Sequence, residues 1–153
     1  IEADDNLLSL IKTEVRGGVL RIETEQKVST SNPLKVRISA PNIDSIEASG
    51  VSKVTLAGVK NDELRIDTSG ASKVNITGET ANFTVEVSGA SSIDAENLKA
   101  EKADVDASGA SHVSVFAIIE LKSDASGASK IVYSGSPKNV EKRSSGASSI
   151  REK

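Results

Sequence analysis

The stretch TSGASKV (residues 68–74) decides the fold of this chain, because its pattern occurs six times. The other copies read ASGVSKV, VSGASSI, ASGASHV, ASGASKI and SSGASSI. The glycines of the six copies are Gly50, Gly70, Gly89, Gly109, Gly127 and Gly146. Successive glycines are 20, 19, 20, 18 and 19 residues apart. This period is too short for helix-pair repeats and is typical of β-solenoids and leucine-rich repeats. Leucine-rich repeats are disfavoured here, because their characteristic Leu and Asn positions are absent, so a β-solenoid is predicted.

Apolar and polar residues alternate on both sides of the motif glycine. The position four residues before it holds Ile46, Ile66, Val85, Val105, Ser123 and Lys142. The position four residues after it holds Val54, Val74, Ile93, Val113, Ile131 and Ile150. Such period-two alternation indicates strands with one buried face. Around the glycine itself, we expect Ser69 to lie outside and the small Ala71 to tuck inside.

A second break follows eight positions after the motif glycine. The residues there are Gly58, Gly78, Asn97, Ala117 and Gly135. Gly and Asn tolerate positive φ, so this position predicts a second corner. Each repeat is therefore predicted to form a strand, a Ser-Gly corner, a second strand, a Gly/Asn corner and a variable return.

Stacked repeats of this kind predict an all-β, single-stranded parallel β-helix with about 19 residues per coil. Right-handed winding is expected from the usual handedness of parallel crossovers, and short-coil left-handed helices are the alternative. We predict one domain over 1–153, with non-motif coils in 1–40, six repeats in 41–150 and a tail at 151–153. We predict that the six motif glycines are structural residues that form the Ser-Gly corners.

The flanking regions differ from the repeats. Alternation around Arg16-Gly17-Gly18 predicts a hairpin, and residues 33–41 predict a further strand. Residues 5–11 predict one short helical turn after an Asp or Asn cap. The last coil places Lys142 and Ser144 at inward positions, a polar end that would stop neighbouring chains from adding to the sheet.

Composition excludes several classes of protein. The chain has no Cys, Met or Trp and only three aromatic residues, so the core must be thin and aliphatic. A net charge of −3 without a basic cluster disfavours nucleic-acid binding. No apolar run approaches the roughly 18 residues of a spanning helix, so no transmembrane segment is expected.

Three positions before the glycine, five repeats carry a carboxylate. Together these form the acidic column, made of Glu47, Asp67, Glu86, Asp106 and Asp124. Equivalent residues in adjacent coils lie about 5 Å apart, so like charges would repel. Ion pairing across the corner is one interpretation, with partners at Lys53, Lys73, His112 and Lys130 and help from Arg65 and Lys122. A Ca²⁺ or other hard-cation site is the alternative; no cofactor is otherwise expected.

Catalysis has weaker support in the sequence. Two of the carboxylates could serve as the acid and base of a glycosidase, but a regular ladder lacks the local irregularity of an active site. The serines of the motif lack bases, since His112 is the one histidine. We expect their hydroxyls to bond backbone groups or each other along the stack. No residue is assigned a catalytic role.

The segment DNLLSLIKTEVRGGVLRIET, then PLKVRISAPNIDSIEASGVSKVTL and the serial SGAS motifs, resembles the bacterial family called putative auto-transporter adhesin, head GIN domain. The resemblance covers essentially the whole chain. It implies a β-helical protein exported to the envelope of Bacteroidetes-type bacteria, in the periplasm or at the cell surface, with lipid anchoring outside these residues. The family's opening Gly-Ile-Asn-type segment is missing, so we expect the N-terminal part of the domain to be absent.

The resemblance implies no catalytic or ligand-binding residues. The sequence thus predicts a non-enzymatic envelope or surface module, adhesin-like or structural, with a glycan or an envelope protein as partner. A carbohydrate-active β-helix, binding or cleaving polysaccharide, is the alternative.

Overall fold

A computed structural model of the chain describes residues 10–24, 36–38, 40 and 42–153. The chain divides into two compact units, Ile1–Ala40 and Pro41–Lys153. The boundary between them falls where the motif-free region gives way to the repeats.

The first unit contains the predicted antiparallel hairpin of β1 (Ile11–Arg16) and β2 (Val19–Thr24). Gly17 and Gly18 form its two-residue turn with φ values of 56° and 80°. Two consecutive positive φ angles match the twist of a tight hairpin, and glycine adopts them without a Cβ penalty.

Two other predictions for this unit fall largely outside the described residues. Of the predicted helical turn, only Leu10, in a turn, and Ile11, the first residue of β1, are described. Of the predicted strand at 33–41, residues 36–38 and 40 are described, and they form no strand.

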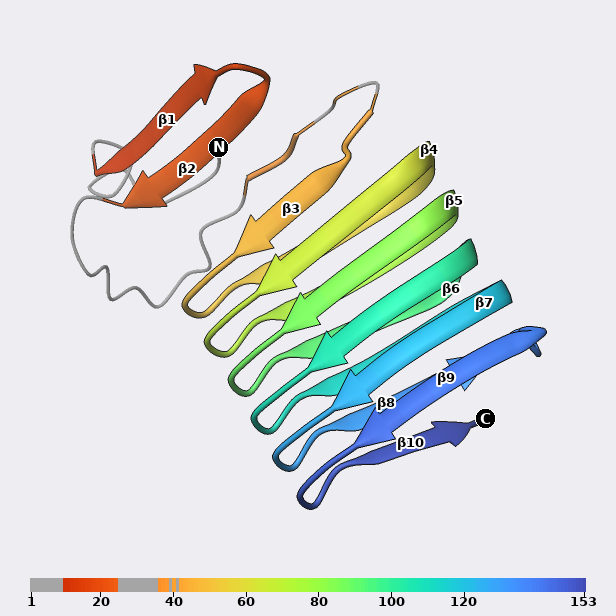
Figure 1. Ribbon diagram of the computed structural model, residues 1–153. Helices are drawn as coiled ribbons and strands as arrows, with labels where there is room; N and C mark the ends of the chain where they lie inside the picture. The colour runs from red at the N-terminus through yellow and green to blue at the C-terminus, as the bar shows by residue number, and fades with distance from the viewer. Residues whose placement is uncertain (1–9, 25–35, 39, 41) are drawn as a thin grey trace. The chain divides into compact units, whose positions relative to one another are not determined.

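The second unit is a parallel β-solenoid, which confirms the predicted fold class (Figure 1). Its strands are β3 (Ser45–Ala48), β4 (Lys53–Thr68), β5 (Lys73–Val87), β6 (Ser92–Ala107), β7 (His112–Ala125), β8 (Lys130–Ser134), β9 (Asn139–Ser144) and β10 (Ser149–Glu152). Each strand pairs in parallel with its equivalent one coil away.

The coils are flattened into two layers. The first half of β7 pairs with β8 and its second half with β9, so the strand bends from one layer into the other. We call layer A the segments that precede a Ser-Gly corner and layer B the segments that follow one. Figure 1 shows β3 and β9 in the nearer layer, A, and β8 and β10 behind them in layer B.

The second corner differs from its prediction. The strands β4 to β7 run through it without a break and change layer with irregular pairing, for example between Leu56 and Val59. Gly58, Gly78 and Gly135 have positive φ as expected, whereas Asn97 and Ala117 do not. A long strand can bend gradually over several residues, so this position does not require a left-handed residue in every coil.

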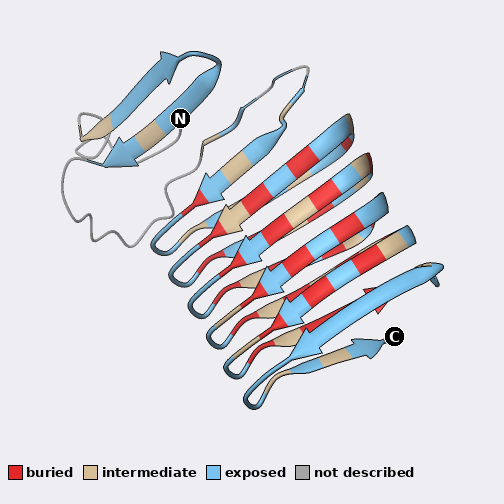
Figure 2. Ribbon diagram, viewed as in Figure 1, coloured by how far each residue is buried: buried red, intermediate tan, exposed pale blue. Residues whose placement is uncertain are grey.

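The core lies between the two layers and is almost entirely aliphatic. Buried and exposed residues alternate along β4 to β7, as Figure 2 shows. Phe83 and Tyr133 are the large aromatic side chains buried in it. The rest of the core consists mainly of Val, Ile, Leu and Ala, the thin core that the composition predicts.

The Ser-Gly corner is a tight turn stacked directly on its neighbours. Gly70 has φ +84°, and a Cβ added there would lie 2.4 Å from the carbonyl oxygen of Gly50. The next amide, of Ala71, donates a 2.8 Å hydrogen bond to that same oxygen. Glycine is therefore required at this position for two reasons, its positive φ and the close approach of the neighbouring coil.

One prediction at this corner is wrong. Ala71 is exposed, and the buried residue is the second serine, Ser72, which is 3% exposed. Residues two and four positions before the glycine, and two and four positions after it, point inward. The alternation of inward and outward residues therefore continues through the turn. The equivalent residues Ser91, Ser111 and Ser129 are also buried.

The last coil is polar, as predicted. Every residue of β9 is exposed (Figure 2), including Lys142 and Ser144 at inward positions. The Lys142 ammonium lies 4.5 Å from the centroid of the Tyr133 ring and covers this end of the core.

Candidate functional site

The acidic column runs straight up the outer surface of layer A. The strand register pairs Glu47 with Asp67, Asp67 with Glu86, Glu86 with Asp106, and Asp106 with Asp124. Asp67 is half-buried and the other four residues are exposed. Parallel in-register pairing therefore brings five carboxylates into one row, one per coil, and the row ends at Arg143.

Ion pairing across the corner does not occur among the described residues. Glu86 is the column member with an ion pair, at 2.5 Å from Arg65 of the preceding coil, and Lys122 lies 3.5 Å from Glu120 instead. The expected partners Lys53, Lys73, His112 and Lys130 stand three positions after the glycine, on layer B. Because odd positions point outward on both layers, the acidic column and these residues face opposite sides of the solenoid.

Asp106 is the most crowded carboxylate of the column. Partial burial, then the neighbouring charges of Asp124, Glu86 and Asp104, raise the pKa of Asp106 above its ordinary value of 3.8. Asp104 lies two residues earlier on the same strand and points to the same side. The sequence shows this second acid, but its effect depends on the register, which brings three coils together here.

The acidic column is not arranged as a cation cage. Within the described ranges, no three His, Asp or Glu side chains lie close enough together to hold a metal ion. The column is a row of separate charges, and hard cations such as Ca²⁺ are held in proteins by convergent oxygen ligands. The Ca²⁺ alternative therefore finds no convergent ligand set in this part of the chain.

The motif serines form hydrogen bonds at the Ser-Gly corner. Ser129 Oγ donates to the carbonyl oxygens of Ala107 at 3.0 Å and Ser126 at 2.8 Å. Ser52 Oγ and Ser72 Oγ lie 2.9 Å apart in adjacent coils. These contacts confirm that the hydroxyls bond backbone groups and each other along the stack. Ser111 Oγ is buried without a hydrogen-bond partner.

His112 stands apart from the buried serines. It is half-buried on the outer side of layer B, where its register partners are Ser92 and Lys130. The register therefore places this histidine in a row of surface residues, and the structure gives it no hydrogen bond to a serine hydroxyl among the described residues. This placement offers no base for a serine nucleophile.

One group of residues was predicted only as a set of ion-pair partners. Lys53, Lys73, Ser92, His112 and Lys130 form a second continuous row, the lysine column, on layer B. The signal for it is present in the sequence as the position three residues after each glycine. From the sequence alone, the charged members of this row were interpreted as ion-pair partners of the acidic column.

A solved structure of another protein is similar in fold to this chain. A crystal structure of a putative adhesin from Bacteroides fragilis has a TM-score of 0.79 to this chain, at 22% sequence identity, over 97% of this chain and 79% of that one. At this identity the likeness shows the fold. A search of curated proteins gave no match. The described residues include no helix that is long and apolar enough to cross a membrane.

The sequence itself identifies the group to which this solenoid belongs. A family model matches residues 1–137, which include the hairpin, the first five Ser-Gly corners and all of the acidic and lysine columns. The chain belongs to the family described as putative auto-transporter adhesin, head GIN domain.

Proposed function

We propose that this solenoid is a non-enzymatic, adhesin-like binding module of the bacterial cell envelope, and that it holds a partner on its flat outer surfaces. The observation that carries the proposal is the register, which repeats the same outward residue types in consecutive coils along both layers. A surface of regular rows suits a partner that is itself extended and repetitive, such as a polysaccharide. Membership of an adhesin family supports the same role.

Binding and catalysis are separated by one paired experiment. The full chain is applied to an array of purified bacterial and host glycans, and each glycan bound is then incubated with the protein while new reducing ends are measured. We expect saturable binding that the free glycan competes away, without new reducing ends. Turnover of any polysaccharide would contradict the non-enzymatic assignment, and an array without binding would favour a purely structural spacer.

The location of the module is part of the proposal. We infer that the protein is exported and lies in the periplasm or at the cell surface. Protease treatment of intact cells, compared with cells whose outer membrane has been permeabilised, distinguishes these two locations. Protection of the protein in both preparations would place it inside the cell and contradict the proposal.

A further inference from the structure

The lysine column on layer B places three lysines in five consecutive coils along the solenoid axis. Lys53 pairs in register with Lys73, and His112 with Lys130, while Ser92 occupies the coil between the two pairs. Lys53 and Lys73 are exposed, and the other three residues are half-buried. Successive positions are separated by the spacing of neighbouring strands, about 4.8 Å.

The three lysines of this row are not neutralised within the described part of the chain. Other lysines are: Lys60 pairs with Glu79, Lys122 with Glu120 and Lys153 with Glu96. No described carboxylate lies within ion-pair distance of the ammonium groups of the lysine column. Like charges in register on adjacent strands repel, so a bound anion would relieve this repulsion.

The residues beside the column are mostly polar. Two positions further along each strand stand Thr55, Asn75, Asp94, Ser114, Val132 and Arg151. The hydroxyl and amide groups of Thr55, Asn75 and Ser114 can exchange hydrogen bonds with sugar hydroxyls.

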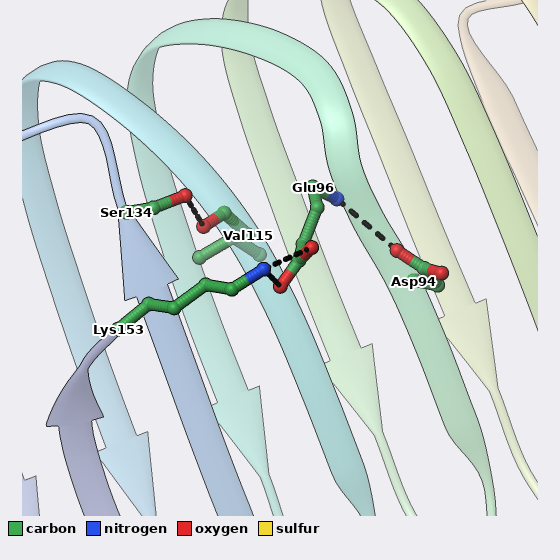
Figure 3. A network of polar contacts seen from close by, with 5 residues as sticks. All are labelled: Asp94, Glu96, Val115, Ser134 and Lys153. Carbon is green, nitrogen blue, oxygen red and sulfur yellow. Dashed lines mark hydrogen bonds and ion pairs between the residues drawn. The ribbon is translucent and has the colours of Figure 1, made fainter.

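The acids on this side are partly neutralised already. Lys153 Nζ lies 2.9 Å from Glu96 Oε2, and the Glu96 amide donates to Asp94 Oδ1 at 3.3 Å (Figure 3). The Ser134 hydroxyl beside them donates to the Val115 carbonyl oxygen at 3.5 Å. Positive charge therefore dominates the outer side of layer B, whereas carboxylates dominate that of layer A.

We infer that the outer side of layer B binds a linear anionic polysaccharide that runs along the solenoid axis. Its carboxylate or sulfate groups lie over the lysine column, and its hydroxyl groups face the adjacent Thr, Asn and Ser side chains. The rise of one coil is close to the length of one sugar residue, so successive charged sugars meet successive coils. Duplex DNA, with one charge about every 1.7 Å, does not match this spacing. The inference rests on the proposed binding function and names the class of ligand and the side that binds it.

Two variants of the full chain test whether the outer side of layer B is the binding side. The triple variant K53Q/K73Q/K130Q removes the cations of the column, and K60Q/K99Q/K102Q removes the same charge from residues outside it. Both are compared with the unchanged chain after circular dichroism and thermal melting have confirmed that each variant is folded. The probe is polygalacturonate, and the matched ligand is its methyl ester, which keeps the backbone and removes the charge.

We expect polygalacturonate to bind the unchanged chain and the outside variant alike, and the column variant roughly 3- to 150-fold more weakly, since each exposed ion pair contributes a factor of about 1.4 to 5. Binding should weaken between 50 and 300 mM salt by a similar factor, because exposed charges are screened. The methyl ester should not bind.

Four outcomes overturn the inference. Equal losses in both triple variants, or equal affinity for duplex DNA at matched charge, would indicate attraction of any polyanion to scattered lysines. Binding of a neutral glycan that is unchanged in K53Q/K73Q/K130Q would leave the proposed function standing and reject this side as its site. A chain that binds no glycan at all rejects both proposals.

Discussion

At the scale of single residues, the Ser-Gly corner places different demands on adjacent positions. The glycine must adopt positive φ and must also leave room for the carbonyl oxygen of the coil before it. The second serine must bury a hydroxyl, which is tolerated because that hydroxyl donates to carbonyl oxygens that the turn leaves inside. The alanine between them faces outward, and its small size matters less than the sequence suggests.

Substitution of the motif glycines separates the two demands on that position. Gly89 has φ +81°, and an added Cβ would lie 2.5 Å from the Gly70 carbonyl oxygen. Gly50 has φ +74° with no described atom within 4 Å of the added Cβ. We expect Gly50→Ala to lower the free energy of unfolding by roughly 1–2 kcal/mol, the cost of a left-handed residue, and Gly89→Ala by about 3 kcal/mol or more. Urea unfolding measures both, and equal losses would contradict a role for stacking.

The buried serines offer a second matched pair. Ser129 Oγ lies within hydrogen-bonding distance of two backbone carbonyl oxygens, whereas Ser111 Oγ, equally buried, has no partner among the described residues. We expect Ser129→Ala to lower the free energy of unfolding by roughly 1 kcal/mol and Ser111→Ala to change it by less than about 0.5 kcal/mol or to raise it. The prediction fails if the two variants unfold at the same urea concentration.

At the scale of strands and columns, the distance of a residue from the motif glycine, even or odd, explains what the sequence could and could not predict. The alternation predicted the strands, the Ser-Gly corner and the register that aligns the acidic column. It also contained the orientation of Ala71 and Ser72, because even positions face inward throughout. The prediction that Ala71 lies inside followed its small size and hydrophobicity instead of this alternation. The ion pairs across the corner were wrongly predicted because an odd position before the corner and an odd position after it face opposite sides.

Crowding in the acidic column has a consequence for stability. The pKa of Asp106 is raised on folding, so the folded protein holds that proton more tightly than the unfolded chain does. This contribution to stability is fully present below pH 3.8 and is lost as the pH rises through the folded pKa. Asp106→Asn should therefore raise the melting temperature at pH 7, and the gain should disappear at pH 3.

The control for this effect is Asp62→Asn, which removes the same charge from a residue outside the column. Melting temperatures of both variants and of the unchanged chain are compared from pH 3 to pH 8. A gain of the same size in both variants would assign the effect to net charge, and a gain for Asp106→Asn that persists at pH 3 would contradict repulsion as its cause.

At the scale of the whole solenoid, the polar last coil determines whether the repeats can continue into another molecule. Lys142 stands at a position that holds Ile or Val in the first four coils. Lys142→Ile with Ser144→Val would complete an apolar inner surface on the edge strand β9, and such edges recruit further strands. We expect this variant to form concentration-dependent oligomers in sedimentation velocity, while Lys138→Ile, outside the inward positions, should sediment as the unchanged chain does. Identical sedimentation of the two variants would reject the capping role.

The lysine and acidic columns show how far the candidate site could be predicted at this scale. Both rows are written in the sequence as fixed offsets from the motif glycine, so the sequence alone identifies their members. Their separation onto two sides follows from the Ser-Gly corner, where the chain reverses between layer A and layer B. The second bend, which completes the flattened coil, carries no constant residue type, since Asn97 and Ala117 replace glycine there.

The parallel pairing of coil on coil also determines how the module responds to tension. Its hydrogen bonds point along the stacking direction, so a pull on the two ends of the repeats loads the terminal coil first and opens it alone. Each coil released would add roughly 65 Å of extended chain, from about 19 residues at 3.3–3.6 Å each. A solenoid built in this way should lengthen in equal steps and dissipate work at each step. In the binding role proposed above, it would therefore absorb a sudden shear before the attachment to its partner breaks.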